Sequence, residues 1–205
     1  FDYYLSSTYS YTTDASLLLP THVLGTTYYA AARQTFGVRR YNCTPYNFAM
    51  GYIPGFISVV GTQNSTTVSV TYKAYTQAGT GLPPQNPGAT VTYTLALGEV
   101  LPVLSRFPTD GTACSGTQTT ATCAGSCSCD YCDMGANYDM TGTYITSNKP
   151  IAVFSGHSCS FIPYNQWACD HLEEQMMPLQ TWGRNFVATY TSSYSDTTAV
   201  GNVYR

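Results

Sequence analysis

Charged side chains are scarce in this chain of 205 residues. They make up 9% of it, the formal net charge at pH 7 is -3, and only two lysines occur, Lys73 and Lys149. Soluble domains usually carry about 25% charged residues. Binding to nucleic acid needs a dense field of lysine and arginine, so the composition argues against a nucleic-acid partner. The pair Arg39-Arg40 is too small to change this.

Long apolar runs and catalytic motifs are also missing. The longest apolar runs, such as residues 151–154, are far shorter than a membrane span, so we expect none. The sequence contains no Gly-x-Ser-x-Gly, His-Glu-x-x-His or phosphate-loop pattern. An enzyme that depends on a metal or a cysteine is therefore the least favoured class of function, and we expect no cofactor.

Hydroxyl-bearing and apolar β-forming residues are abundant instead. The chain has 49 serines and threonines and 19 tyrosines, and its 43% hydrophobic content is enough for a sizeable core. Segments with period-two alternation are bounded by glycine, proline or asparagine, as is typical of strands. The sequence predicts a mainly β fold, an antiparallel β-sandwich, with a barrel or propeller as the alternative. The predicted strands lie within residues 23–31, 55–61, 66–75, 89–97, 100–104, 141–147, 151–156 and 185–191.

Three local features complete the predicted architecture. Residues 61–67 are expected to be the tip of a hairpin, and residues 109–138 a cysteine-rich loop insertion with too little apolar side chain to form a core. One short helix is predicted over residues 169–177, because Asp170 is a suitable N-cap and Glu173 stands at the capping-box position.

The two ends of the chain differ from its middle in composition. A segment rich in tyrosine, serine and threonine, residues 1–16, is expected to precede a β-rich domain over residues 17–205. The last residues resemble a strand that has only begun. We therefore expect an incomplete C-terminus and a sheet edge open to a neighbour, either another copy of the chain or an adjacent repeat.

Eight cysteines predict an oxidising, extracellular environment. A disulfide between Cys159 and Cys169 is preferred. If it forms, one of the five cysteines between residues 114 and 132 must pair with Cys43. Fifteen pairings of the remaining six stay open, and the spacing Cys127-x-Cys129-x-x-Cys132 also resembles a soft-metal tract. The six are Cys43, Cys114, Cys123, Cys127, Cys129 and Cys132.

Residues 155–187 hold the densest chemistry. The weak metal candidates His157 and His171 flank Cys159 and Cys169, so the four side chains offer ligands acceptable to zinc, although their spacing is unlike familiar zinc sites. A cysteine nucleophile with a histidine base is less favoured because nothing supplies an oxyanion hole. With a disulfide at this position, both tryptophans, at positions 167 and 182, are expected to pack around it, and the histidines to hydrogen-bond near it.

Two N-glycosylation sequons support the extracellular environment. Asn42-Cys43-Thr44 and Asn64-Ser65-Thr66 both fit the acceptor pattern and lie beside turn-forming residues. We therefore expect covalent glycans at Asn42 and Asn64.

Several motifs resemble those of a known family. They are "MTGTYITSNKPIAVFSGHSCSFIP", "ACDHLEEQMMPLQTWGRNFV", "GFISVVGTQNSTTVSV" and "LPTHVLGTTYYAA". Together they cover most of residues 17–190 and resemble the N-terminal domain of the IgG Fc-binding protein family, whose members are secreted and associated with mucus. The resemblance implies a β-rich, disulfide-bonded, non-catalytic module of a long extracellular protein. It carries no binding residues over to this chain.

The preferred function is an extracellular structural or adhesive module, a glycosylated subunit or repeat of a larger fibrous assembly. Its expected partners are neighbouring copies of itself or adjacent repeats. The alternative is a binding module that recognises extracellular glycans, mucin or immunoglobulin through exposed aromatic residues and the cysteine-rich loop. An enzyme comes third.

Overall fold

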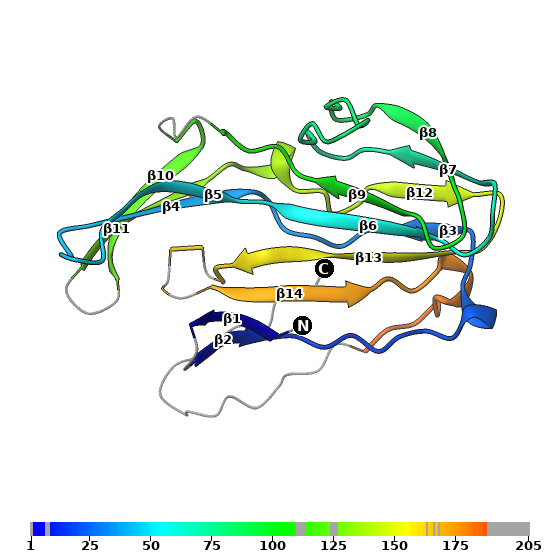
Figure 1. Ribbon diagram of the computed structural model, residues 1–205, viewed down its shortest axis with the longest axis horizontal. Helices are drawn as coiled ribbons and strands as arrows, with labels where there is room; N and C mark the ends of the chain where they lie inside the picture. Colours follow the sequence, from blue (N-terminus) through cyan, green and yellow to red (C-terminus); the bar gives the residue numbers. More distant parts are fainter. Residues whose placement is uncertain are drawn as a thin grey trace.

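The computed structural model describes residues 2–6, 9–109, 114–123, 127–162, 164–165, 167 and 169–187. Fourteen strands and three short 3-10 helices make up this part of the chain (Figure 1). Part of the strand predicted within residues 185–191 lies outside the described residues, and residues 185–187 form no strand. The elements are β1 (Asp2–Ser6), β2 (Tyr9–Thr13), η1 (Thr21–Val23), β3 (Thr27–Tyr29), β4 (Phe36–Tyr41), β5 (Phe48–Ile53), β6 (Gly55–Gly61), β7 (Thr66–Thr71), β8 (Thr90–Leu95), β9 (Val100–Leu104), β10 (Thr117–Cys123), β11 (Cys127–Asp133), η2 (Ala136–Tyr138), β12 (Tyr144–Ser147), β13 (Ile151–Ser160), β14 (Asp170–Gln175) and η3 (Leu179–Thr181).

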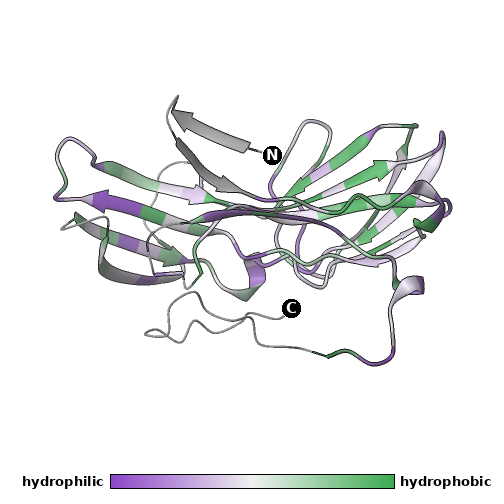
Figure 2. Cartoon of the chain, turned by 90° about the horizontal axis from the view of Figure 1, so that it is seen from below, coloured by the Kyte–Doolittle hydropathy of each residue, from purple (hydrophilic) through white to green (hydrophobic). Residues whose placement is uncertain are grey.

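Two four-stranded antiparallel sheets enclose the main core. Their strand orders are β3-β12-β7-β8 and β14-β13-β6-β9. Buried residues alternate with more exposed ones, for example along β6 and β7, so every second side chain points inward. Green apolar bands alternate with paler ones along the strands (Figure 2). The inward side chains form one buried cluster that includes Tyr28, Ile57, Val68, Ile145 and Val153. The prediction of a mainly β, sandwich-like fold is confirmed. Each described sheet has two edge strands, so the barrel alternative is wrong for this part of the chain.

A third sheet, of order β10-β11-β4-β5, extends the molecule at one end (Figure 1). The predicted cysteine-rich loop is here a β10–β11 hairpin that pairs with β4 along six residues. Three of its cysteines and Tyr131 are buried against Phe36, Val38 and Phe161 in a second cluster; the three are Cys123, Cys127 and Cys129. The expectation that this segment contributes no core is therefore wrong, because half-cystines pack as apolar side chains and replace the missing aliphatic residues.

The predicted helix over residues 169–177 is a strand. Residues 170–175 form β14, which pairs antiparallel with β13. Backbone hydrogen bonds to β13 replace those of a helix, so tertiary pairing overrides the local helix signal.

The predicted hairpin tip at residues 61–67 is instead a crossing between sheets. β6 and β7 follow one another in sequence but belong to opposite sheets of the sandwich. A tight turn between two β-formers is compatible with either arrangement, so the sequence alone could not separate them.

Candidate functional site

The structure joins Cys159 and Cys169 in a disulfide at the end of β13. The side chain of His157 is 1% exposed, and its Nδ1 accepts a hydrogen bond from the Cys159 N–H at 3.2 Å. His171 lies outside the core, where its ring stacks on Phe56 with centroids 6.1 Å apart. Its Nδ1 lies 3.2 Å from the carbonyl oxygen of Ser158. Both histidines thus contact the backbone beside the disulfide.

The four candidate zinc ligands do not converge. Both sulfurs are used in the disulfide, and the rings of His157 and His171 contact different aromatic neighbours, Phe36 and Phe56. Within the described part of the chain, no group of three or more His, Cys, Asp or Glu side chains is arranged to hold a metal ion. The reactive residue types within residues 155–187 therefore lie in separate environments and do not form one site.

Burial sets the protonation of His157. Loss of solvent lowers the pKa of His157 to about 4, and the positive charge of Arg33 acts in the same direction. The ring is therefore neutral at physiological pH, which suits its role as acceptor of the Cys159 N–H.

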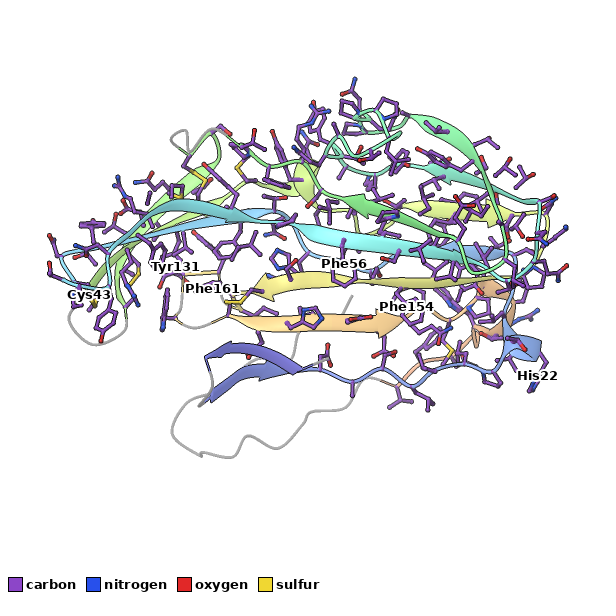
Figure 3. All side chains as sticks on the ribbon, viewed as in Figure 1. His22, Cys43, Phe56, Tyr131, Phe154 and Phe161 are labelled. Atoms are coloured by element: carbon purple, nitrogen blue, oxygen red, sulfur yellow. A yellow bond between two sulfur atoms is a disulfide. The ribbon has the colours of Figure 1, made fainter. Side chains whose placement is uncertain are left out.

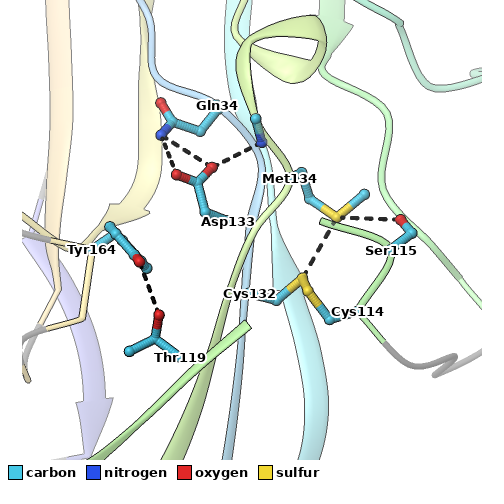
Figure 4. Close-up of a disulfide and its surroundings, with 9 residues drawn as sticks. Gln34, Cys114, Ser115, Thr119, Cys132, Asp133, Met134 and Tyr164 are labelled. Atoms are coloured by element: carbon cyan, nitrogen blue, oxygen red, sulfur yellow. Dashed lines mark hydrogen bonds between the residues drawn. A yellow bond between two sulfur atoms is a disulfide. The ribbon is translucent and has the colours of Figure 1, made fainter. Parts of the chain in front are cut away.

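The other six cysteines form three further disulfides: Cys43–Cys127, Cys114–Cys132 and Cys123–Cys129. All eight cysteines are paired. Figure 4 shows the surroundings of Cys114–Cys132, where Thr119 of β10 is hydrogen-bonded to Tyr164 at 2.9 Å. This contact joins the β10–β11 hairpin to the 161–169 loop that the Cys159–Cys169 disulfide closes.

A cluster of one half-buried arginine and three exposed aromatic residues lies at this end of the molecule. We call it the Arg40 surface; it consists of Arg40, Tyr46, Phe48 and Trp167. The Arg40 guanidinium carbon lies 5.1 Å from the ring centre of Phe48, 5.3 Å from Trp167 and 5.9 Å from Tyr46. Tyr46 is 66% exposed and Trp167 39%. Cation–π contacts of this length hold the cation and the rings as one unit.

Strand register and two disulfides position this surface. Arg40 of β4 pairs with Phe48 of β5, so the two side chains are neighbours across the sheet. Between them the chain turns through residues 42–47, where the Tyr46 N–H donates to the Cys43 carbonyl at 2.5 Å. The Cys43–Cys127 disulfide ties this turn to β11. Trp167 comes from the loop closed by Cys159–Cys169.

Aromatic contacts continue from this surface into the second core cluster. Ring centroids lie 5.7 Å apart for Trp167 and Phe161, and 4.6 Å apart for Phe161 and Phe36. Figure 3 shows Cys43, Tyr131 and Phe161 gathered at the same end, far from His22. Trp167 thus rests on a buried ring, which restricts its position.

The two neighbouring arginines have different roles. Arg39 pairs with the buried carboxylate of Asp130, which also accepts hydrogen bonds from Thr120 and Tyr41. Burial raises the pKa of Asp130, but the hydrogen bonds from Thr120 and Arg39 outweigh it and hold that pKa below its usual value. The Nε of Arg40 donates to the Tyr46 carbonyl at 2.7 Å. Among the described residues, none accepts a hydrogen bond from its terminal nitrogens.

The remaining sequence-predicted residues lie elsewhere. Asn42 and Asn64 are exposed, Asn42 beside the Arg40 surface and Asn64 in the crossing between β6 and β7. The expectation that Trp182 packs around the Cys159–Cys169 disulfide is wrong, because its ring lies 6.3 Å from that of Tyr29 at the other end of the sandwich. The Arg40 surface was not predicted from the sequence. The only signal was the alternation of basic and aromatic residues in "RRYNCTPYNF".

These features define a class: a disulfide-bonded, mainly antiparallel β domain with exposed aromatic clusters. A sequence model of the family described as IgGFc binding protein matches residues 14–205. The chain therefore belongs to the IgGFc-binding protein family, as the motifs predicted. Human IgGFc-binding protein is 35% identical over 60 residues, which are 29% of this chain and 1% of that protein. No solved structure matches the chain. In its described part, no helix is long and apolar enough to cross a membrane.

Proposed function

We propose that this chain is an extracellular, non-catalytic adhesive module of a larger assembly, and that it holds a protein partner through the Arg40 surface. The observation that carries the proposal is the contact of the half-buried Arg40 with three exposed rings, those of Tyr46, Phe48 and Trp167. Tryptophan, tyrosine and arginine are the residues in which the binding energy of protein interfaces concentrates. A solvated polar surface alone would not need three aromatic rings around one cation.

Rigidity favours binding at this surface. Two disulfides hold the loops that supply Tyr46 and Trp167, and Phe161 supports Trp167 from below. Side chains that are fixed before binding lose little conformational entropy when a partner arrives, so more of the contact energy is retained as affinity.

The chemistry of the surface fits an acidic group of the partner. The terminal nitrogens of Arg40 present a planar fork of N–H donors, which matches the two oxygens of a carboxylate. The surrounding rings would pack against apolar side chains beside that carboxylate. Candidate partners are the Fc part of immunoglobulin G, which the name of the human relative states, and neighbouring copies or repeats of this chain.

The extracellular placement rests on covalent chemistry. Four disulfides pair all eight cysteines, which is stable only where thiols are oxidised. The exposed sequon residues Asn42 and Asn64 are the proposed glycan sites. A glycan on Asn42 would stand at the margin of the Arg40 surface and would limit which partners approach it.

Loss of Trp167 is expected to weaken binding. Trp167→Ala and Arg40→Gln should each reduce affinity for a protein partner at least tenfold, since truncating an interface anchor costs about 2 kcal/mol or more. Binding to the human Fc fragment is measured by biolayer interferometry, and self-association by sedimentation equilibrium. Because Arg40 would pair with a carboxylate, the affinity should also fall as salt concentration rises.

Two variants at exposed positions serve as matched controls. Trp182→Ala and Arg184→Gln remove the same side-chain types from another part of the chain, and both should bind the partner like the unaltered protein. Equal affinity of Trp167→Ala and the unaltered chain would contradict the proposal. So would the absence of both Fc binding and self-association at micromolar concentrations.

A further inference from the structure

A second exposed surface lies on the outer face of the sheet β3-β12-β7-β8, at the opposite end from β10 and β11 (Figure 1). Strand pairing aligns eight side chains in two rows across the four strands, and every one of them bears a hydroxyl. We call this set the hydroxyl face. One row is Tyr29, Tyr144, Thr71 and Thr90, and the other is Thr27, Thr146, Ser69 and Thr92.

The alternation of the strands fixes the direction of these rows. The intervening residues Tyr28, Ile145, Val68 and Val70 are at most 1% exposed and belong to the core. Successive side chains of a strand point to opposite faces, so both rows point outward. Adjacent strands lie about 4.8 Å apart, so each row extends about 14 Å across the sheet.

The four strands carry no formal charge. Their sequences are TYY, YITS, TTVSVT and TVTYTL, without lysine, arginine, aspartate or glutamate. The strands themselves therefore offer a ligand no ion pair, and the first charged side chain along β7 is the exposed Lys73, two residues beyond Thr71. The hydroxyls offer donors and acceptors in a regular two-dimensional array, of which Thr71 and Thr90 already contact each other at 2.9 Å.

Three exposed aromatic rings close one end of this array. Tyr29 and Tyr144 are cross-strand neighbours with ring centroids 5.0 Å apart, and Trp182 lies 6.3 Å from Tyr29. The Trp182 Nε1–H donates to the Met177 carbonyl at 3.1 Å, which fixes the indole. Trp182 is 48% exposed, Tyr29 40% and Tyr144 36%, whereas aromatic side chains of this size are usually more deeply buried.

The close approach of the chain after β14 to β3 explains why Trp182 stands here. A side chain at Gly25 would lie 2.5 Å from the side chains of Pro178 and Gln180, so only glycine permits this packing. The Gln180 side-chain amide then donates to the Thr26 hydroxyl at 3.3 Å. The packing of Pro178 and Gln180 against Gly25 and Thr26 thus positions the chain that carries Trp182.

We infer that the hydroxyl face, together with Trp182, binds a neutral saccharide chain. A pyranose ring presents an apolar C–H face that stacks on aromatic rings and equatorial hydroxyls that exchange hydrogen bonds with serine, threonine and tyrosine. Rigid tyrosine and tryptophan rings supply this contact at low entropic cost. The charge-free array and the adjoining rings match both parts of such a ligand, over a length suited to a short oligosaccharide.

This inference is independent of the proposed protein contact. The Arg40 surface and the hydroxyl face lie at opposite ends of the molecule and share no residue (Figure 1). A second protein copy would need a more apolar face than one built of hydroxyls, and an acidic polymer would need cations. A neutral saccharide is the occupant that the chemistry favours.

Calorimetric titration with cellohexaose and with the hexamer of N-acetylglucosamine tests the inference. At least one of these neutral hexasaccharides should bind, and a sulfated hexasaccharide should bind at least tenfold more weakly. Trp182→Ala and Tyr144→Ala should each weaken binding at least tenfold. The double variant Thr71→Val and Thr92→Val, which keeps side-chain shape and removes two hydroxyls, should also weaken it.

Matched variants separate this result from a general loss of structure. Trp167→Ala, in the Arg40 surface, and Thr117→Val, in the β10–β11 hairpin, should leave saccharide affinity unchanged, and thermal unfolding should show every variant folded. The inference is overturned if neither neutral hexasaccharide binds at millimolar concentration, if Trp182→Ala binds as well as the unaltered chain, or if the sulfated chain binds as tightly. None of these outcomes bears on the protein contact at Arg40.

Discussion

We expect the double variant Cys43→Ala and Cys127→Ala to have a free energy of unfolding about 4 to 5 kcal/mol lower than the unaltered chain. This disulfide spans 84 residues, and closing so long a loop removes much conformational entropy from the unfolded chain. The bond also ties the 42–47 turn to β11, so the same variant should lose affinity for a protein partner at the Arg40 surface. Equilibrium unfolding in denaturant measures the first effect.

The matched control is the double alanine variant of Cys123 and Cys129. That disulfide spans six residues, and the same relation gives about 2 kcal/mol. Each double variant removes one disulfide from the second core cluster. The difference between their losses of unfolding free energy therefore reports the effect of loop length. Equal losses in the two variants would contradict the entropic explanation and would attribute stability to local packing instead.

Mild acid is expected to destabilise the fold through His157. The pKa of this buried ring is about 4 in the folded chain and near 6.5 when unfolded, so the unfolded chain binds more protons between these values. The stability that the fold gains from the neutral His157 ring is present above pH 6.5 and is lost as the pH falls toward 4. Between pH 7 and pH 5 the free energy of unfolding should drop by about 2 kcal/mol.

His157→Asn should remove most of this dependence. The asparagine side-chain oxygen can replace Nδ1 as acceptor of the Cys159 N–H, while the group that titrates is gone. His22→Asn changes an exposed histidine and should keep the full loss between pH 7 and pH 5. Denaturant unfolding at the two pH values measures both variants. If His157→Asn kept the dependence as well, its source would be another group.

The sheets of the sandwich were predictable because their strands alternate plainly. β6 and β9 lie at the predicted residues 55–61 and 100–104, and β7 begins at the predicted Thr66. In β7 the buried valines alternate with serine and threonine, and in β6 and β9 buried aliphatic residues alternate with more exposed ones, so one periodic pattern reports both the strand and its buried face. Local sequence is enough to predict a strand and its buried face where every second residue is buried.

The third sheet was not predictable in this way. β10 and β11 bury half-cystines and Tyr131 instead of aliphatic side chains, so their core pattern resembles a polar loop until the disulfides are known. β14 contains good helix formers and becomes a strand only through pairing with β13. Both features depend on partners distant in sequence, which local propensity does not contain.

The candidate surfaces were hidden for a related reason. Each brings together side chains from segments far apart in sequence. Arg40 contacts Trp167 at one end, and Tyr29 contacts Trp182 at the other. The sequence showed many aromatic residues but not which of them meet. We therefore propose that this adhesive module joins a protein, bound at the Arg40 surface, to a saccharide bound at the hydroxyl face.

The two tryptophans of the chain allow a direct test of this claim, because one lies in each surface. Trp167→Phe and Trp182→Phe leave single-tryptophan proteins whose fluorescence reports on one surface each. Each is titrated with the protein partner that the binding measurements identify, either the Fc fragment or further copies of the chain, and then with a neutral hexasaccharide. We expect the protein partner to shift the emission of Trp167 only and the saccharide to shift the emission of Trp182 only. Emission of either tryptophan that responds to both ligands, or to neither, would contradict the claim.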